Sequence, residues 1–366
     1  SGCHQRQKEL AMYGGLLHHV SAIAAVVVFA IACGSGVPPR YLLIPLLGST
    51  SLLILYFGLA SVTYRSQVAS YLSLFALGLA TLHLASIVAL SFPTMIPLDA
   101  PAIALLGLVL VLLASFAAAW NKAHSAESPT ASPQPSPWLR PFSCNAESLL
   151  AAWTRPRREA SLFYAAVGMI VMVAHRWFLY GSWDEANGQA LITYGCVAVT
   201  LALASRLYDS ALLTYGAATV VTISAVPQLL IAGLPMSHLG IALSVVALLF
   251  WIAGFVFERH CISHHRAGRK LLAASLTRVY EQPLLRCSAV LAVIAIAHSL
   301  LVWKADGWSV SQTPIVVACA LGAVTLLLNA RSLNVLHHVT RARVLVYLAC
   351  ASLTGCALAV TSMAGS

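Results

Sequence analysis

The sequence predicts an all-α, polytopic integral membrane protein, and two observations carry this prediction. Of the 366 residues, 60% are hydrophobic and only 9% are charged, whereas charged residues make up about 25% of a typical soluble domain. The hydrophobic residues form continuous runs near the roughly 20 residues that a helix needs to cross a bilayer. Helices are favoured over strands because the runs do not alternate and because lipid offers backbone groups no hydrogen bonds. The lipid bilayer is therefore the first expected partner.

The hydrophobic runs define about eleven transmembrane helices at roughly 20 residues each. The first run is too long for the core of a signal peptide. Because the sequence starts at Ser1 rather than Met, we expect a processed chain or part of a longer product. The predicted spans are residues 13–33, 41–60, 68–91, 100–120, 159–179, 188–205, 210–231, 237–257, 285–303, 313–330 and 343–362.

The positive charges support this assignment, because cytoplasmic loops are enriched in Lys and Arg. With alternating spans, the side of the N-terminus holds eighteen of the 21 Lys and Arg residues, and the other side holds Arg40, Arg176 and Lys304. One missed or extra span would scramble this segregation. The sequence therefore predicts a cytoplasmic N-terminus, an external C-terminus and insertion in the cell inner (plasma) membrane, with an organelle membrane as the alternative. The net charge of +10 comes from these span ends, which argues against nucleic acid as a partner.

Two polar segments divide the predicted spans into bundles. A Ser- and Pro-rich stretch reads as a flexible cytoplasmic linker, and a second segment is rich in Arg. The predicted regions are residues 1–120, a four-span bundle; 121–158, the linker, with a short interfacial helix at 145–153; 159–257, a four-span bundle with an external loop containing Trp and His; 258–284, a basic amphipathic cytoplasmic segment; and 285–366, a three-span bundle.

The basic segment and the last bundle each carry a further hypothesis. Leu271, Leu272, Leu276 and Val279 separate from the basic residues at helical spacing, which predicts a helix over 263–280 lying along an anionic membrane surface. A solvated loop that only sets the orientation is the alternative. An offset of 123 residues pairs Ala174-His175 with Ala297-His298 and Cys196 with Cys319. This offset suggests the hypothesis that spans 9–11 are a duplication of spans 5–7.

The richest chemistry lies in the stretch 174–189, which contains His175, Trp183 and Asp184 in an otherwise nearly chargeless region. The motif Gly181-Ser182-Trp183-Asp184, the following Ala190-Leu191-Ile192-Thr193 and the span order resemble the cytochrome c assembly family of haem-handling membrane proteins. The resemblance covers roughly residues 97–240. It implies that His238, two spans later, is a haem ligand and that Trp183, Asp184 and His175 surround the haem. We therefore expect the loop from His175 to Gln189 to dock near His238.

The sequence also departs from that family. The earlier tryptophans of the motif are missing, and the stretch 93–101 has Asp99 as its only ionisable group where the family has an external His. Haem iron takes axial ligands such as imidazole, so His238 alone leaves the site incomplete. The alternative for the tryptophans of this loop and for Trp303 and Trp308 is an aromatic belt at the headgroup level.

Other histidines and cysteines offer weaker alternatives. His18-His19 and His337-His338 stand at span ends, where two helices can present imidazoles to a haem. His83 lies within span 3, where an ionisable side chain indicates a functional site; a hydrogen bond to a neighbouring helix is the alternative. The run 260–265 holds His260, Cys261, His264 and His265, which are zinc-type ligands. Flanking arginines oppose a cation there, so no metal site is predicted. The nine cysteines form no CxxC pair and indicate neither a disulfide framework nor an iron–sulfur site.

The functional prediction depends partly on residues and motifs that the sequence lacks. The interiors of the predicted spans hold no Asp, Glu or Lys, whereas coupled transporters usually bury such groups along their pathway. No P-loop, GxSxG or HExxH motif nominates catalytic residues. The leading hypothesis is a non-catalytic subunit or scaffold of a larger membrane assembly, with other membrane subunits as partners. The alternatives are a haem-handling protein and a facilitator for a neutral or lipid-like solute.

Overall fold

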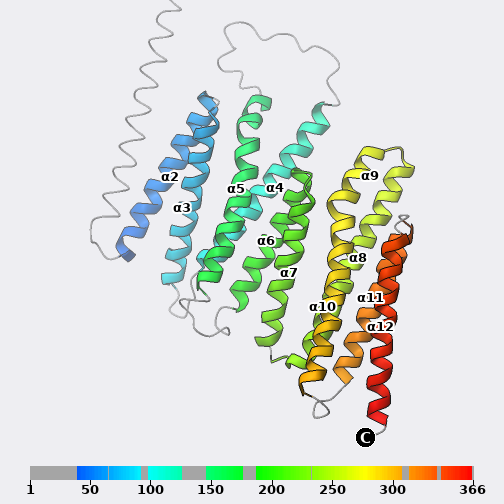
Figure 1. Ribbon diagram of the computed structural model, residues 1–366. Helices are drawn as coiled ribbons and strands as arrows, with labels where there is room; N and C mark the ends of the chain where they lie inside the picture. The colour runs from blue at the N-terminus through cyan, green and yellow to red at the C-terminus, as the bar shows by residue number, and fades with distance from the viewer. Residues whose placement is uncertain are drawn as a thin grey trace, which may run out of the picture. The chain divides into compact units, whose positions relative to one another are not determined.

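The structure is a computed structural model that describes residues 39–64, 66–91, 98–125, 146–175, 187–231, 233–306, 313–335 and 339–364. Every regular element in these ranges is helical (Figure 1), which confirms the all-α class. The helices are α2 (Pro39–Tyr64), α3 (Gln67–Ser91), α4 (Asp99–Ser125), α5 (Ala146–Ala174), α6 (Asn187–Leu207), α7 (Ala211–Ile231), the 3-10 helix η2 (Met236–His238), α8 (Leu239–Arg266), α9 (Lys270–Leu276), the π-helix η3 (Thr277–Glu281), α10 (Gln282–Asp306), α11 (Thr313–Val335) and α12 (Val339–Ala364).

The lengths and compositions of these helices fit a membrane protein. Among the described residues, six helical stretches are long and apolar enough to cross a membrane: Gln67–Ala89, Asp99–Trp120, Gly188–Leu207, Met236–Arg266, Lys270–Trp303 and Thr313–Ser332. Three shorter apolar helices cover Leu46–Ser61, Ala211–Val226 and Ala342–Gly355. The count of about eleven spans stays a prediction, and its first span, 13–33, lies outside the described residues.

The chain divides into two compact units, Ser1–Gly181 and Ser182–Ser366. Unit 1 holds α2 to α5, and unit 2 holds α6 to α12. This division falls after the linker that the sequence placed between bundles, because α5 packs on α3 and α4. The fifth predicted span, which is α5, therefore belongs with α2, α3 and α4.

Small residues bring α4 and α5 of unit 1 together in a contact that we call the α4–α5 seam: Ala100, Ala104, Gly107, Ala165 and Gly168. A Cβ atom on Gly107 would lie 2.9 Å from the Ser161 carbonyl oxygen, and one on Gly168 would lie 3.1 Å from the Ala104 nitrogen. The three alanines are at most 1% exposed. Small residues at such spacing let helix backbones approach closely, which is how apolar helices associate in lipid.

Helix α5 is longer than its predicted span. It starts at Ala146, so the interfacial helix expected at 145–153 is the first part of one continuous helix and is not a separate element. Its polar end is held to α3, because the Tyr71 hydroxyl donates to Glu159, which also accepts from Arg155 at 2.7 Å.

The core of unit 2 consists of α8, α10, α11 and α12, which lie side by side in Figure 1. Its apolar centre includes Leu243, Ala247, Ala295 and Leu326. Short polar side chains also join the helices. Ser244 donates to the Ala318 carbonyl at 3.1 Å, Asn329 to the Ser288 hydroxyl at 2.9 Å, and Ser352 to the Cys319 carbonyl at 3.0 Å.

The basic segment of unit 2 folds as a helical hairpin. Helix α8 continues to Arg266, and a turn with Gly268 at φ 77° leads into α9, η3 and α10. The single helix predicted over 263–280 is wrong, because this turn separates the end of α8 from α9 and η3. The apolar face also differs from the expected lipid-facing stripe, because Leu276 and Val279 are buried with Cys261 of α8. Only Leu271, which is 90% exposed, still faces outward as predicted.

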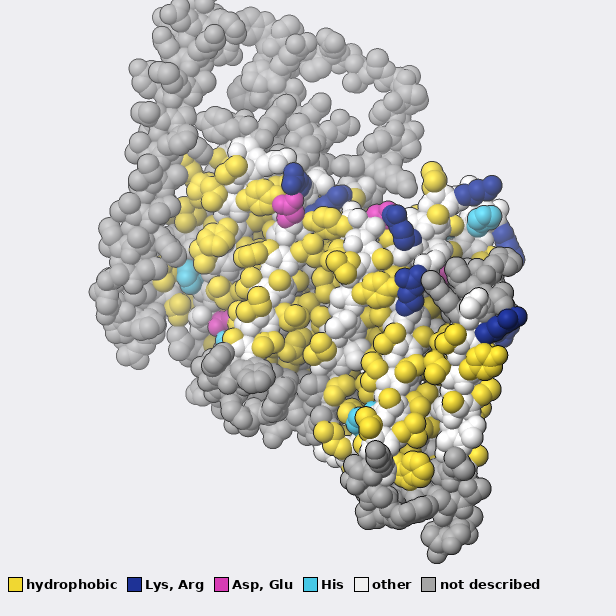
Figure 2. All heavy atoms as spheres, in the orientation of Figure 1, with side chains coloured by type: hydrophobic (Ala, Val, Ile, Leu, Met, Phe, Trp, Pro, Cys, Tyr) yellow, Lys and Arg dark blue, Asp and Glu magenta, His cyan; other side chains and the backbone are white. Residues whose placement is uncertain are grey.

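Lys and Arg side chains gather at one end of unit 2 above its apolar flank (Figure 2). This end contains the α8–α9 turn, the start of α10, the end of α11 and the start of α12. Every Lys and Arg of the described part of unit 2 belongs to these elements, to the C-terminal part of α8, to α9, to η3 or to the end of α6, except Lys304 near the other end of α10. We call this the basic end of unit 2.

Candidate functional site

Two carboxylates are buried at the basic end of unit 2. Glu258 of α8 is 8% exposed and Glu281 of η3 is 2% exposed, although acidic residues are almost never fully buried unless paired. Neither forms a salt bridge among the described residues. We call Glu258 and Glu281 the carboxylate pair. It lies in helices that continue beyond the predicted spans 237–257 and 285–303, so the expectation of span interiors without acidic residues stays a prediction.

Sequence reasoning missed the carboxylate pair because it ended spans at the edge of the hydrophobic runs. The predicted spans stop at 257 and resume at 285, which leaves both residues outside. The helices continue across these edges, since α8 runs to Arg266 and α10 is joined through η3 to α9. One available signal was Pro283, which follows the Glu281-Gln282 pair and disturbs any helix that passes through it.

Pro283 explains why a π-helix forms at this point. Proline has no backbone N–H, so the Val279 carbonyl, four residues earlier, has no α-helical donor. The hydroxyl of Thr214 on α7 donates to that carbonyl instead, at 2.7 Å. The Gln282 N–H bonds back to the Thr277 carbonyl, which widens the turn by one residue. Such π turns are rare and are frequently found at functional sites.

Each member of the carboxylate pair has one oxygen engaged and one open. The Thr277 hydroxyl donates to Oε2 of Glu281 at 2.7 Å, and Ser332 of α11 hydrogen-bonds Glu258. Oε1 of Glu281 and Oε2 of Glu258 are buried without a hydrogen-bond partner among the described residues. Buried unsatisfied oxygens cost about 1–3 kcal/mol each, so their presence calls for a functional explanation.

The carboxylate pair lines a cavity of about 730 Å³. Cys261 lies beside the pair, and its thiol interacts with Thr277 and Glu281. The exposed side chains of His265 and Lys270 stand at the mouth of the cavity. The volume falls within the range of about 300–1,000 Å³ that is usual for small-molecule sites. Buried, mutually repelling carboxylates with open oxygens are suited to binding a proton.

The α6–α7 turn holds the η3 region in place. Asp209 has a positive φ of 50° in this turn, and its carboxylate accepts from Ser275 at 2.8 Å and pairs with Arg278. The Tyr280 hydroxyl donates to the Ala202 carbonyl of α6 at 2.7 Å. The Tyr280 ring stacks on Phe257 with centroids 4.7 Å apart. These contacts fix the helical turn that carries Glu281.

The predicted haem residues are only partly within the described residues. His238 ends η2 and precedes α8, and its Nδ1 lies 3.2 Å from the Ser237 hydroxyl. His175 follows α5 in unit 1, close enough to Asp99 for an electrostatic interaction. Trp183 and Asp184, and with them most of the 175–189 loop, lie outside the described ranges. The docking of this loop near His238 therefore stays a prediction.

The run 260–265 does not present one set of metal ligands. His260 and His264 face each other with their Nε2 atoms 2.9 Å apart, whereas Cys261 is buried against η3. His265 lies at the mouth of the cavity. Within the described ranges, no three His, Cys, Asp or Glu residues are grouped to hold a metal ion. His18-His19 and His337-His338 lie outside those ranges.

No protein-family model matches this chain, and no curated protein or solved structure matches it either. The resemblance to the cytochrome c assembly family, with haem at His238, therefore stays a prediction.

Proposed function

We propose that this chain is a multi-pass membrane protein that moves a small solute together with a proton, and that the carboxylate pair of unit 2 carries the proton. The observation that supports this proposal is the burial of Glu258 and Glu281 beside one cavity, each with an open oxygen. Buried carboxylates without a salt bridge are costly, and such groups cluster at functional sites.

The chemistry follows from where the carboxylates lie. Each loses hydration on burial, and the two interact electrostatically, so ionising both at once is unfavourable. A proton shared by the pair removes that repulsion. The basic residues at the cavity mouth favour entry of a solute with an acidic group, whose charge then changes the proton affinity of the pair. Proton binding and solute binding are thereby coupled.

This proposal departs from the leading sequence-based hypothesis, a non-catalytic subunit or scaffold within a larger membrane assembly. That hypothesis depended partly on span interiors without acidic residues, and α8 and η3 contain two. The facilitator alternative was for a neutral or lipid-like solute. The proposal keeps the movement of a solute across the membrane, but the site of the carboxylate pair fits a proton and an acidic solute instead. The scaffold is the alternative that the following experiment distinguishes.

Infrared difference spectroscopy of the purified chain, titrated with acid and base, tests the proton site. We expect a carboxyl C=O stretching signal that is altered in both Glu258→Gln and Glu281→Gln. Glu159→Gln is the matched control, because Glu159 of unit 1 is paired with Arg155 and bonded to Tyr71. A spectrum unchanged in both unit 2 variants contradicts the proton site.

Proteoliposomes that contain a pH-sensitive dye test the transport step. Under an imposed membrane potential and with succinate as the acidic probe solute, we expect succinate-dependent proton flux in the unaltered chain and at least about tenfold less in either unit 2 variant, because each removes a proton carrier. A carboxyl signal without flux would support the pair as a binding site and contradict transport, which favours the scaffold.

The proposed topology keeps about eleven spans, with the basic end of unit 2 in the cytoplasm and the protein in the inner (plasma) membrane. The clustering of Lys and Arg at one end of unit 2 supports this orientation (Figure 2). The cavity of the carboxylate pair then opens toward the cytoplasm.

A further inference from the structure

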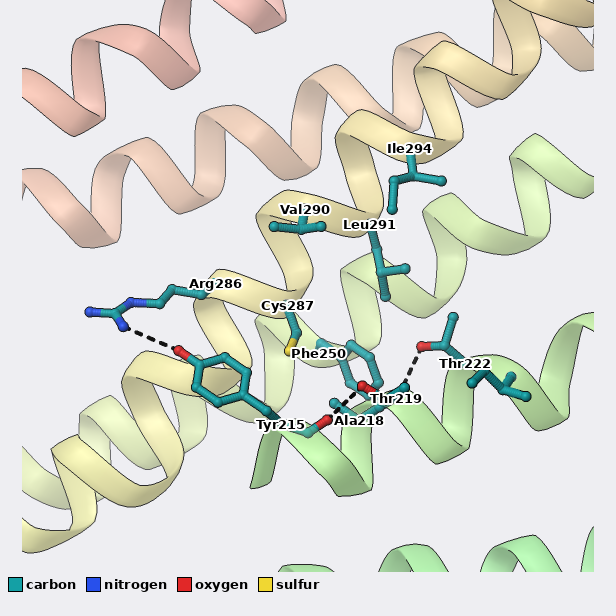
Figure 3. Close-up of a pocket in the computed structure, with 11 residues that line it drawn as sticks. Tyr215, Ala218, Thr219, Thr222, Phe250, Arg286, Cys287, Val290, Leu291 and Ile294 are labelled. Carbon is teal, nitrogen blue, oxygen red and sulfur yellow. Dashed lines mark hydrogen bonds between the residues drawn. The ribbon is translucent and has the colours of Figure 1, made fainter. Parts of the chain in front are cut away.

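A second cavity of unit 2, of about 400 Å³, lies between α7, α8 and α10 (Figure 3). It is separate from the cavity of the carboxylate pair, with which it shares no lining residue. We call it the acyl groove. The residues that line it include Tyr215 and Thr222 of α7, Phe250 of α8, and Arg286, Val290 and Ile294 of α10.

The acyl groove is apolar along its length. The hydroxyls of Thr219 and Thr222 donate to carbonyls of their own helix, at 2.8 and 2.9 Å, so neither needs a partner inside the groove. Ile223 is 60% and Val290 59% exposed, which shows that the groove opens to the outside of the bundle. A bilayer would bring lipid chains to this opening.

One end of the acyl groove carries an unneutralised cation. Arg286 donates to the Tyr215 hydroxyl at 3.2 Å and to the Gln282 amide oxygen at 3.4 Å, which uses two of the five N–H donors of a guanidinium. No salt bridge joins Arg286 to an acidic residue of the described chain. The remaining donors are available to an oxyanion, and the fork of a guanidinium matches phosphate geometry.

The dimensions match one leaflet of a bilayer. From Arg286 to Ile294 the groove follows α10 for eight residues, about 12 Å at 1.5 Å per residue. Half of the roughly 30 Å hydrocarbon core is about 15 Å. Arg286 lies at the basic end of unit 2, where headgroups are expected, and Ile294 lies deeper. A chain that enters beside Arg286 therefore stays within a single leaflet.

We propose that the acyl groove binds one phospholipid with an anionic headgroup, whose phosphate contacts Arg286 and whose acyl chain lies along Val290, Leu291 and Ile294. This inference does not depend on the carboxylate pair. It assigns a structural or regulatory lipid to the seam between α7 and α10, near the point where Thr214 of α7 supports η3.

Native mass spectrometry of the full chain in mixed micelles tests this site, with phosphatidylglycerol and phosphatidylcholine in equal amounts. We expect one retained phosphatidylglycerol per chain and about tenfold weaker retention in Arg286→Gln, the loss typical of a charge-assisted phosphate contact. Val290→Trp fills the groove without changing the charge and is expected to lower retention of both lipids. Arg266→Gln is the control, because Arg266 is exposed at the same end of unit 2 and lies outside the groove.

The outcomes separate the sources of binding. Equal losses in Arg286→Gln and Arg266→Gln would show general attraction to anionic lipid and overturn the proposal. Unchanged retention in both Arg286→Gln and Val290→Trp would also overturn it. Added inorganic phosphate should not displace the lipid, because the acyl chain supplies part of the binding; displacement by phosphate alone would contradict an acyl site.

Discussion

The α4–α5 seam of unit 1 and the η3 region of unit 2 are both buried helix contacts, but they consist of different types of residue. The seam uses alanine and glycine, so that two backbones meet. The η3 region uses a π turn, a proline and two carboxylates with open oxygens. Close packing of small residues stabilises helices in lipid, whereas buried unsatisfied polar atoms destabilise.

The difference indicates where close packing stabilises this protein and where it buries ionisable groups. A contact that serves only packing has no reason to retain a buried carboxylate, since apolar side chains fill the same volume without desolvation cost. The η3 region retains two. We infer that unit 1 supplies a helical framework and that unit 2 carries the ionisable site, and the following variants test that contrast.

The largest expected effect is on the α4–α5 seam. Gly107→Val places methyl groups where even a Cβ atom would lie 2.9 Å from the Ser161 backbone oxygen, and backbone cannot rotate away. We expect a loss of about 2–3 kcal/mol in the free energy of unfolding, the upper part of the usual range for overpacking, because the clash is with backbone. Thermal unfolding in detergent measures it.

Gly48→Val on α2 is the matched control, because nothing lies within 4 Å of a Cβ atom at that position. It carries the same change of helix propensity without the clash. If both variants lower the unfolding temperature equally, the α4–α5 seam is not the packing contact that the structure indicates.

The comparison of the two regions also explains how much of the fold could be predicted from the sequence. Continuous apolar runs predict helices because lipid leaves no alternative, and each predicted span within the described residues overlaps a helix. The close approach at Gly107 and Gly168 was not foreseen, since glycine in an apolar run looks the same whether it faces lipid or a neighbour. Which helices pair depends on contacts between distant residues, so the boundary at Gly181 was missed as well.

The candidate site was less predictable than the fold, for a related reason. Glu258 and Glu281 are 23 residues apart in the sequence and meet only because the α8–α9 turn reverses the chain. Hydropathy ends a span at the first charge, although a helix continues past it. The haem prediction instead followed the residues of the 174–189 stretch, most of which lie outside the described ranges.

The next effect concerns the hydrogen bond that supports η3. Thr214→Val keeps the shape of the side chain but removes the donor to the Val279 carbonyl, which leaves a buried acceptor unsatisfied. We expect a loss of about 1–2 kcal/mol. Pro283→Ala restores an N–H at the α-helical position for the same carbonyl, so Thr214→Val should cost less in that background.

A double-mutant cycle measures this coupling, for which we expect about 1 kcal/mol, within the range for groups that share a partner. Independent, additive effects would contradict the assignment of the π turn to Pro283. Altered infrared carboxyl signals in Pro283→Ala alone would link the π turn to the position of Glu281.

The smallest expected loss of unfolding free energy is at the exposed ion pairs of the two units, in contrast to their buried contacts. Asp209→Asn removes the charge that pairs with Arg278 while keeping an oxygen for Ser275, and Asn tolerates the positive φ of this position. Because both side chains of the pair are about half exposed or more, we expect a loss of only about 0.2–1 kcal/mol. Salt screens exposed pairs, so the loss should disappear at high ionic strength. Glu159→Gln of unit 1, which breaks the pair with Arg155, should show the same small, salt-sensitive loss.

A larger, salt-insensitive loss in Asp209→Asn alone would contradict this expectation. It would mean that the α6–α7 turn helps to position Glu281, so that the site of the carboxylate pair extends to the surface of unit 2.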